Sequence, residues 1–470
     1  MSIINNMPQK SGMTLEALIE EYYVYAGETI NAGTFVEFVN GYSGDFTTGT
    51  SSWTGIDTTS GSATGLSAAE LPNGNVLIVH SNNATDYKLC AMVCTINGAN
   101  IVPGVNVELV SSTNTGQHTA IGVIDDTRVV ILYNSDASNY YLYGMVCTIE
   151  GTQINVGTGV QLSSESYSAQ YAKIIVMETT KLFITYSKSD INGLMGSTCY
   201  VNGNTLSVQQ SVEIWYNTNA AKYSTVNQLT DSTFLVTHAI NNSDGNYLVG
   251  HICTVDNFTI KVSNSVTIDT EDSAFGHYCA KLNSTKAVVV YNEDTYREPM
   301  YGRVLTINGT TFTVGSQVTL DSSDNGVGYY ISGVPLSETQ VLLFYTDEVS
   351  WGIEYSVCAS LITVNGTSIT PHTKVSLDTA DEKLSPITLL LNNKNVFCTC
   401  SDGTAIYGQL LSIDYSSNLP TTTVKTYVIE KQVKIATTDV CNGLAKTGGS
   451  GTDGIGRKDK IQIYVPNTTT

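Results

Sequence analysis

The sequence is poor in charged side chains, and above all in arginine. Charged residues make up only 14% of the 470 residues, and arginine occurs at four positions, Arg128, Arg297, Arg303 and Arg457. Arginine is the side chain that best grips carboxylate and phosphate groups, so substrates that need an arginine cluster are not expected. The formal net charge of −20 would repel a polyanion. Nucleic acid is therefore not expected as a partner.

The sequence also lacks a long apolar run. No window approaches the roughly 18 uninterrupted apolar residues of a membrane span, and the opening segment MSIINNMPQKSG has no apolar core flanked by basic residues. These absences predict a soluble protein without an export signal and without membrane insertion.

What the sequence does contain is an internal repeat. A strand that ends in a turn recurs as VCTING, VCTIEG, TCYVNG, ICTVDN, VLTING, LITVNG and LLSIDY. A small residue precedes the cysteine-type site of each copy by three positions, with spacings of 53, 52, 54, 52, 57 and 49 residues: Ala91, Gly144, Gly196, Gly250, Gly302, Ala359 and Gly408. A fixed period of about 53 residues, the length of a four-stranded blade, predicts an all-β, seven-bladed β-propeller.

Each repeat also holds a continuous apolar strand, such as VLIVH from Val76 and VVILY from Val129. Such runs are typical of strands buried on both faces, as in sheets that stack around an axis. The fifth residue of this strand is mostly aromatic, and we expect the polar end of its side chain to reach water or a neighbouring blade. The residues at this place are His80, Tyr133, Tyr186, His238, Tyr291, Tyr345 and Cys400.

The segment from Trp53 to Thr59 matches the outer strand of a repeat that has no body before it. We predict that it completes the seventh blade and closes the ring, because closure removes exposed strand edges. The propeller is thus assigned to residues 51–423. Four of the ten cysteines, Cys94, Cys147, Cys199 and Cys253, occupy one position in successive repeats and are predicted to be small buried apolar residues rather than disulfide partners.

The two ends, residues 1–50 and 424–470, lie outside the repeats. Thr14 to Glu21 is a candidate for a short helix, and segments such as TFVEFVNG, TYVIEKQVKIATT and KIQIYVPN are predicted strands. Ring closure brings both ends together. We therefore expect them to fold as one small β-barrel or sandwich that carries the propeller as an insertion.

The pairing of AGETINAGTFVEFVNG with GLAKTGGSGTDGIGRKDKIQIYVPN resembles structural proteins of tailed bacteriophages of Gram-positive hosts, of the tail or fibre kind, and also small β-barrel capsid decoration proteins. The resemblance covers roughly the outer 90 residues and not the propeller. A longer, glycine-rich and basic segment from Gly448 to Lys460 departs from the pattern and leaves head, neck and tail all open. The resemblance implies a virion protein that assembles in the host cytoplasm, with other capsid or tail proteins as partners and several copies arrayed on the particle.

For docking onto the particle, the sequence offers one basic cluster and several apolar strand residues in the ends. Cations in an otherwise acidic chain suit the rim of an interface with an acidic partner, while apolar residues supply the anchoring energy. The expected docking residues are Arg457, Lys458 and Lys460 with Phe35, Phe38, Ile461, Ile463 and Tyr464.

No constellation of residues indicates catalysis, a cofactor or a metal. The six histidines are scattered over the repeats and are interpreted as structural. Acidic residues follow the second strand of each blade with irregular spacing, which favours ordinary turns over calcium loops: Asp86, Asp136, Asp190, Asp244, Asp294, Asp347 and Asp402. A sialidase-type site is disfavoured because only Arg297 and Arg303 lie close together.

Binding has stronger support, because aromatic residues fall in or beside loops at the ends of the blades, where rigid rings suit sugar or protein recognition: Tyr140, Tyr141, Tyr143, Tyr296, Tyr329, Tyr330 and Trp351. The first expectation is accordingly a non-enzymatic virion protein whose propeller decorates the particle or touches a host-surface polysaccharide or protein. The alternative is a propeller glycosidase or sugar-binding tail protein that acts on cell-wall or capsular polysaccharide, for which 42 acidic residues leave room for a carboxylate pair.

Overall fold

The chain divides into two units, which are residues 1–47 with 414–470 and residues 48–413. The computed structural model describes, in the second unit, residues 54–57 and 64–412 except 83–86, 99, 113, 136–140, 164–169, 189–192, 217–219, 243–244, 271–275, 293–298, 323–326, 351–353, 378–383, 393–394 and 402–404. In the first unit it describes the backbone of seven strands, given below.

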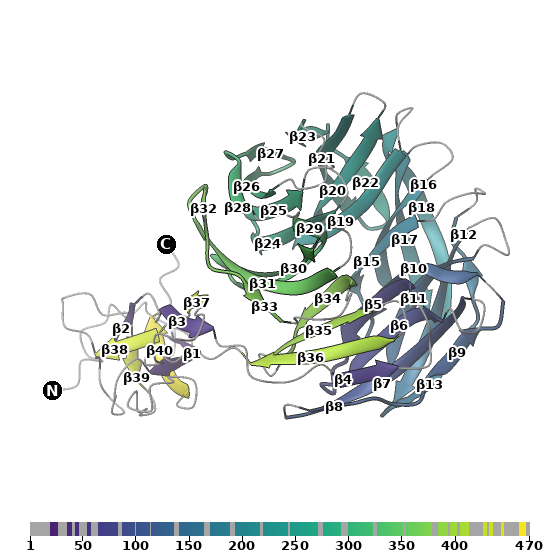
Figure 1. Ribbon diagram of the computed structural model, residues 1–470, viewed down its shortest axis with the longest axis horizontal. Helices are drawn as coiled ribbons and strands as arrows, with labels where there is room; N and C mark the ends of the chain where they lie inside the picture. The colour runs from purple at the N-terminus through teal and green to yellow at the C-terminus, as the bar shows by residue number, and fades with distance from the viewer. Residues whose placement is uncertain are drawn as a thin grey trace, which may run out of the picture. The chain divides into compact units, whose positions relative to one another are not determined.

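The second unit is a seven-bladed β-propeller, as the repeat predicts (Figure 1). The first strands of neighbouring blades contact one another all the way round, which makes them the inner strands. They are β5 (Thr64–Glu70), β10 (Thr115–Val123), β15 (Gln170–Glu178), β19 (Ala220–Thr230), β24 (His277–Asn283), β29 (Val327–Ser337) and β34 (Leu384–Leu390).

The second strand of each blade is the continuous apolar run. These strands are β6 (Val76–Asn82), β11 (Arg128–Ser135), β16 (Lys181–Lys188), β20 (Thr233–Asn242), β25 (Lys286–Asn292), β30 (Gln340–Ser350) and β35 (Asn395–Ser401). The third strands carry the small residues of the repeat. They are β7 (Lys88–Asn97), β12 (Tyr141–Glu150), β17 (Gly193–Asn202), β21 (Gly245–Asp256), β26 (Met300–Asn308), β31 (Glu354–Asn365) and β36 (Ile406–Ser412).

The outer strand is split in five blades and continuous in two. In the first blade the break falls at Pro103 and Gly104, where a Cβ on the glycine would meet the carbonyl oxygen of Val93 at 2.4 Å. The outer strands are β8 (Asn100–Val102) with β9 (Val107–Val110), β13 (Gln153–Asn155) with β14 (Val160–Gln161), β18 (Thr205–Tyr216), β22 (Thr259–Val262) with β23 (Val266–Asp269), β27 (Thr311–Val314) with β28 (Val318–Asp321), β32 (Ser368–Pro371) with β33 (Val375–Ser376), and β4 (Thr54–Asp57).

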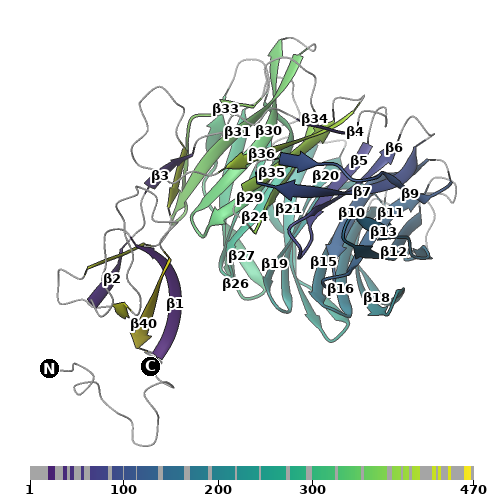
Figure 2. The same ribbon diagram turned by 90° about the horizontal axis from the view of Figure 1, so that it is seen from below.

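Ring closure follows the prediction. Strand β4, from the start of the propeller, pairs antiparallel with β36 from its end, with Gly408 opposite Thr54. Ile56 of β4 is buried in one cluster with Phe397 and Leu410 of the last blade. The first and last repeats therefore share one sheet, and β34, β36, β4 and β5 lie together in Figure 2.

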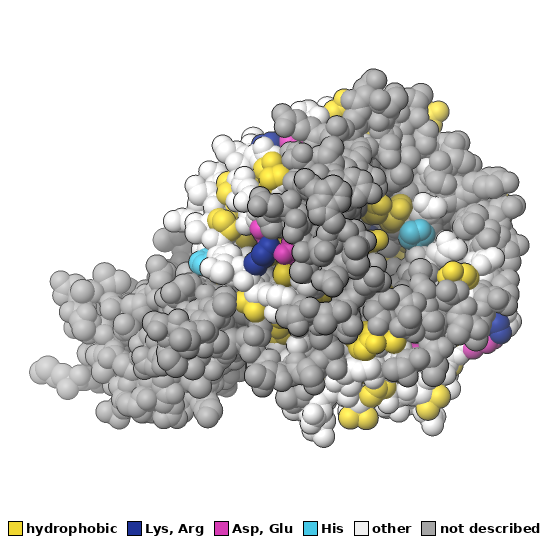
Figure 3. All heavy atoms as spheres, viewed as in Figure 1, with side chains coloured by type: hydrophobic (Ala, Val, Ile, Leu, Met, Phe, Trp, Pro, Cys, Tyr) yellow, Lys and Arg dark blue, Asp and Glu magenta, His cyan; other side chains and the backbone are white. Residues whose placement is uncertain are grey.

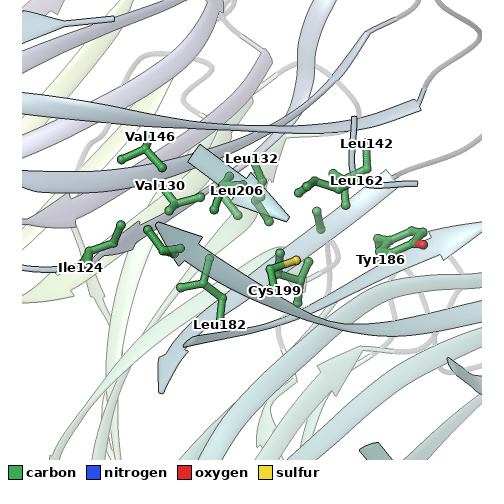
Figure 4. Close-up of a cluster of buried hydrophobic side chains, with 14 of the residues drawn as sticks. Ile124, Val130, Leu132, Leu142, Val146, Leu162, Leu182, Tyr186, Cys199 and Leu206 are labelled. Atoms are coloured by element: carbon green, nitrogen blue, oxygen red, sulfur yellow. The ribbon is translucent and has the colours of Figure 1, made fainter. Parts of the chain in front are cut away.

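The apolar core lies between adjacent blades. One such cluster joins side chains of the second and third blades, among them Leu132, Val146, Leu182 and Leu206 (Figure 4). The small residue of each third strand leaves room for it: a Cβ on Gly144 would lie 2.8 Å from both Leu162 and Leu206. Close packing of this kind explains why the position stays small in every blade.

Cysteines behave as the repeat predicts. Cys94, Cys147, Cys199 and Cys253 are fully buried free thiols. Burial raises the pKa of the Cys199 and Cys253 thiols to about 12. They therefore act as small apolar residues of the core.

The aromatic residue at the fifth place of the second strand reaches the preceding blade. Tyr345 donates a hydrogen bond of 2.8 Å from its hydroxyl to Asp321, and Lys374 pairs with the same carboxylate at 3.0 Å. In the fifth blade, Arg303 donates to the Tyr291 hydroxyl at 2.8 Å and pairs with Asp269 of the fourth blade at 3.0 Å. Polar tips at this place therefore connect neighbouring blades.

The first unit contains a closed five-stranded barrel built from both ends of the chain. Its strands follow the order β1 (Ile19–Ala26), β38 (Gln432–Ile435), β2 (Phe35–Val39), β39 (Gly443–Ala445) and β40 (Lys460–Pro466), and β3 (Ser43–Phe46) pairs with β37 (Thr426–Ile429). The predicted helix is wrong at its end, because Ile19–Glu21 belong to β1 and pair with Val465 and its neighbours in β40. The run of β-branched and aromatic residues that follows favours a strand.

The predicted docking residues fall on two of these strands. Phe35 and Phe38 lie on β2, where Phe38 is opposite Val433, and Lys460, Ile461, Ile463 and Tyr464 lie on β40. Arg457 and Lys458 are outside the described residues. In the part of the chain that the structure describes, no helix is long and apolar enough to cross a membrane.

Candidate functional site at the centre of the propeller

The inner strands of all seven blades line one cavity at the centre of the ring. Its volume is ≈ 490 Å³, and residues of β5, β10, β15, β19, β24, β29 and β34 form its wall. A cavity of this size falls within the range of small-molecule and saccharide sites. Its position on the ring axis places it within reach of every repeat.

One position of the inner strand is aromatic in several blades. In the third blade, the small residue Gly196 pairs with Thr185 of the second strand, and Thr185 pairs with Lys173 of the inner strand. The position in question lies two residues before Lys173 and before its equivalents in the other blades. Around the ring this position is Gly65, His118, Tyr171, Tyr223, Gly276, Tyr330 and Ser385. Tyr171, Tyr223 and Tyr330 line the cavity, and Tyr330 is 45% exposed.

The aromatic rings at this position contact one another. The ring centroid of Tyr171 lies 4.6 Å from that of His118 and 4.6 Å from that of Tyr223, with tilted planes. Burial and then the neighbouring Tyr223 raise the pKa of the Tyr171 phenol. The contacts fix a row of rings along one side of the cavity.

Two of these tyrosines have a backbone conformation that side chains rarely adopt. The φ angles of Tyr171 and Tyr223 are 54° and 51°, in the left-handed region where the equivalent residue of the first blade is Gly65. The strand register shifts at both tyrosines, as in a β-bulge. Tyrosine there costs about 1 kcal/mol relative to glycine, and strain of this kind is concentrated at functional sites.

Hydroxyl groups of the next blade hold this bulge in place. The hydroxyl of Ser224 donates to the carbonyl oxygen of Tyr171 at 3.1 Å, and Thr119 donates to the carbonyl oxygen of Gly65. Ser224 and Thr119 occupy equivalent positions in their strands. The same interaction therefore fixes the αL residue in two different blades.

Lys173 is the charged residue of the cavity wall. It lies on β15, two residues after Tyr171, and its side chain is exposed to the cavity. The protein around it lowers the pKa of the Lys173 ammonium by desolvation. Among the described residues that line the cavity there is no aspartate or glutamate.

His277 also lines the cavity and is anchored by hydroxyl groups. Its Nε2 lies 3.0 Å from the hydroxyl of Thr237, which in turn lies 2.6 Å from the hydroxyl of Thr225. Burial first, and the charge of Lys173 to a smaller extent, lower the pKa of His277 to about 4. The imidazole is therefore neutral at physiological pH.

The buried state of His277 predicts a loss of stability in acid. Its pKa rises from about 4 when folded to the ordinary 6.5 when unfolded, so the unfolded chain binds the extra proton as the pH falls from 6.5 to 4. We expect His277 alone to remove about 3 kcal/mol from the free energy of unfolding over this window. Denaturant titrations of wild type and His277→Gln at pH 7 and pH 4 measure it, and an equal loss in both proteins would contradict the assignment.

Two other histidines pack in the core. His238 and His251 stack with ring planes 6° apart and their Nε2 atoms 3.4 Å apart, beside Trp215. Burial lowers the pKa of both, and in the described part of the chain no three histidine, cysteine or acidic residues gather as metal ligands. The pair belongs to the fourth blade and packs against Trp215 of the third.

The ligand-binding residues expected from the sequence lie mostly where the structure gives no description. Tyr140, Tyr296 and Trp351 are outside the described residues, and only the backbone of Tyr329 is described, in β29. Tyr141 begins β12 opposite Ser135 and is half-buried. Their role in binding stays a prediction.

Sequence reasoning missed most of the cavity residues. Tyr171, Tyr223, His118 and Lys173 lie in the segments HTAIGV, QYAKII and KYSTVN or directly beside them, which were identified as strands but not as a site. A signal was present, because Tyr171 and Tyr223 occupy one place in consecutive repeats. Recognising it requires knowledge of the strand register.

Comparison with known proteins gives structural but not sequence matches. No family model and no curated protein matches the chain. An ulvan lyase, which is a polysaccharide lyase, aligns with a TM-score of 0.50 and 10% identity over 80% of this chain and 96% of the lyase. A protein of unknown function from Dyadobacter fermentans aligns with a TM-score of 0.46 and 10% identity over 70% and 99% of the two chains, and a sialidase from Streptococcus pneumoniae with 0.43 and 10% over 80% and 70%.

These matches correct one expectation from the sequence. The chain was expected not to be an enzyme, but the ulvan lyase that shares its fold is one. The propeller therefore gives no ground for that expectation. At 10% identity the likeness to the lyase establishes the shared propeller fold.

Proposed function

We propose that this protein is a carbohydrate-active propeller that binds a saccharide in its central cavity. The observation that carries the proposal is the presence of Tyr171, Tyr223 and Tyr330 on the cavity wall. The rings of Tyr171 and Tyr223 contact each other, and His118 contacts the ring of Tyr171. Aromatic faces bind the apolar faces of sugar rings at little entropic cost. Tyrosine at two left-handed positions, where glycine is favoured, supports a role for these rings beyond packing.

The fold shared with a polysaccharide lyase supports the same proposal. The chemistry of the cavity favours some reactions over others. Hydrolysis by the usual pair of carboxylates requires two acidic side chains about 5 to 10 Å apart, and the described lining residues include none. Among the described lining residues, the groups suited to proton transfer are the phenols of tyrosine and the neutral imidazole of His277. We assign recognition to the ring faces of the lining tyrosines. We assign proton transfer to the phenol groups of tyrosine and to the imidazole of His277.

Paired substitutions of Tyr223 test the role of the rings. Tyr223→Ala and Tyr223→Gly are both expected to weaken saccharide binding about tenfold, since each removes one stacking surface. Because φ is 51° there, the glycine variant should be about 1 kcal/mol more stable than the alanine variant. The measurements are calorimetric binding to a panel of polysaccharides, release of sugar products by the wild type, and denaturant unfolding.

Tyr216→Ala is the matched control, because Tyr216 lies at the end of outer strand β18 and is 67% exposed. It should bind as wild type does. If the Tyr223 variants also bind as wild type, the cavity is not the saccharide site and the proposal fails.

The expectation that the end segments dock onto a virion stays a prediction. It depends on the resemblance of the two ends to tail and decoration proteins. The partners and location that the resemblance implies therefore add nothing to the assignment of the cavity.

A further inference from the structure

Lys173 is the cation of the cavity wall, and it lacks the acidic partner that several other cations of the propeller have. Lys88, Arg128 and Arg303 each form an ion pair with an acidic side chain, at 3.0, 2.6 and 3.0 Å, and Lys374 pairs with two aspartates. On the face shown in Figure 3 the visible cationic side chains likewise lie beside acidic ones. Among the described residues, Lys173 has no hydrogen-bond or ion-pair partner. Its charge is therefore free to meet a ligand.

The positions level with Lys173 in the other blades carry no charge: Ser67, Ala120, Thr225, Tyr278, Ser332 and Ile387. The two nearby histidines add none at neutral pH, because burial and the proximity of Lys173 lower the pKa of His118 and of His277 to about 4. The wall of the cavity thus holds a single positive charge and, among the described residues, no negative one. This is the reverse of the whole protein, whose net charge is −20.

An unpaired ammonium on the wall of a cavity is costly where protein replaces part of its hydration shell. The cost is recovered when an anion enters, since a charge-assisted hydrogen bond is strongest where the dielectric is low. A protein would not retain such a group for packing, because an uncharged side chain of similar length would be more stable there. The placement indicates a charge kept for a ligand.

We propose that the cavity selects acidic saccharides, with Lys173 binding the carboxylate or sulfate group of a sugar whose ring stacks on Tyr171 and Tyr223. The proposal rests on the saccharide site inferred above and adds its charge specificity. Tyr171 and Lys173 are two residues apart on one strand, so one sugar unit can reach both. Neutral saccharides would leave the ammonium unpaired and would bind more weakly.

The first experiment uses the full chain and three oligosaccharides of equal length: galacturonate oligomers, galactose oligomers, and galactose oligomers with sulfate esters. Wild type is expected to bind at least one acidic series tenfold or more tightly than the neutral series. Lys173→Gln should remove this preference and leave neutral binding unchanged, while Lys173→Arg should retain it. Lys281→Gln is the control, since Lys281 lies on inner strand β24 outside the cavity wall, and it should behave as wild type.

The second experiment needs no sugar. Inorganic sulfate, compared with chloride at equal ionic strength, should raise the melting temperature of wild type and of Lys281→Gln more than that of Lys173→Gln.

Two results would overturn the inference but leave the saccharide site in place. One is an equal rise in melting temperature with sulfate in all three proteins, and the other is equal affinity of wild type for acidic and neutral oligomers. Loss of all binding in the Tyr223 variants together with an unchanged acidic preference in Lys173→Gln would overturn it as well. If no oligomer binds wild type, the proposed function fails, and the sulfate arm alone decides whether Lys173 is an anion site.

Discussion

Leucine at Gly250 is expected to lower the free energy of unfolding by about 3 kcal/mol or more, as overpacking of a tight core does. A Cβ on Gly250 would lie 2.8 Å from the ring of Phe312 in the next blade and 3.3 Å from Ile268. Phe312 and Ile268 are themselves buried in the cluster between the fourth and fifth blades and have no room to retreat. Equilibrium unfolding in denaturant measures the effect, and Gly250→Ala should give an intermediate loss.

Gly309→Leu separates packing from backbone strain. Gly309 lies in a turn with a φ of +62°, and a Cβ there would meet nothing within 4 Å. The substitution should cost only about 1 kcal/mol, from the left-handed backbone. If Gly250→Leu proved no more harmful than Gly309→Leu, the small residues of the third strands would not be set by packing between blades.

Deletion of residues 1–60 is expected to destabilise the whole propeller by about 4 kcal/mol or more, because it removes closing strand β4. Without β4, the edge of β36 loses its partner and the cluster that holds Phe397 and Leu410 loses Ile56. Val76 and Ile78 share that cluster with Phe397 and would still join the first blade to the last. The Glu70 carboxylate would also remain, accepting hydrogen bonds from the backbone NH of Asn392 at 2.9 and 3.0 Å. Unfolding should shift to lower denaturant concentration in a single transition.

Deletion of residues 1–50 provides the control, because it removes β1, β2 and β3 of the end unit and keeps β4. The propeller of this variant should unfold at the wild-type denaturant concentration. A 1–60 deletion with an undiminished cooperative transition would show that ring closure contributes little to stability.

The sequence places the cavity strands but not the direction of their side chains. Side chains alternate along a regular strand, so their facing is readable from the sequence only while the register holds. In β15 and β19 the register shifts at Tyr171 and Tyr223, where the backbone turns into the left-handed region. No local pattern marks a tyrosine in that conformation. Which residues line the axis therefore becomes visible only in the folded ring.

The sequence by itself determined the architecture, because packing between blades repeats the same constraints in every copy. A small residue at Gly144 and Gly302, a buried cysteine at Cys199 and an aromatic tip at Tyr345 follow from contacts that each blade makes with its neighbour. The match of Trp53–Thr59 to an outer strand likewise predicted ring closure.

Only the tertiary structure decided the site, since a cavity on the axis combines three to five residues from each of seven distant repeats. It placed Tyr171, Tyr223 and Tyr330 in one wall with Lys173 beside them, and it left that wall without a described carboxylate in an acidic protein. Each of these residues is unremarkable within its own repeat. Their chemistry arises from closure of the ring, which brings them and the unpaired charge of Lys173 within reach of one ligand.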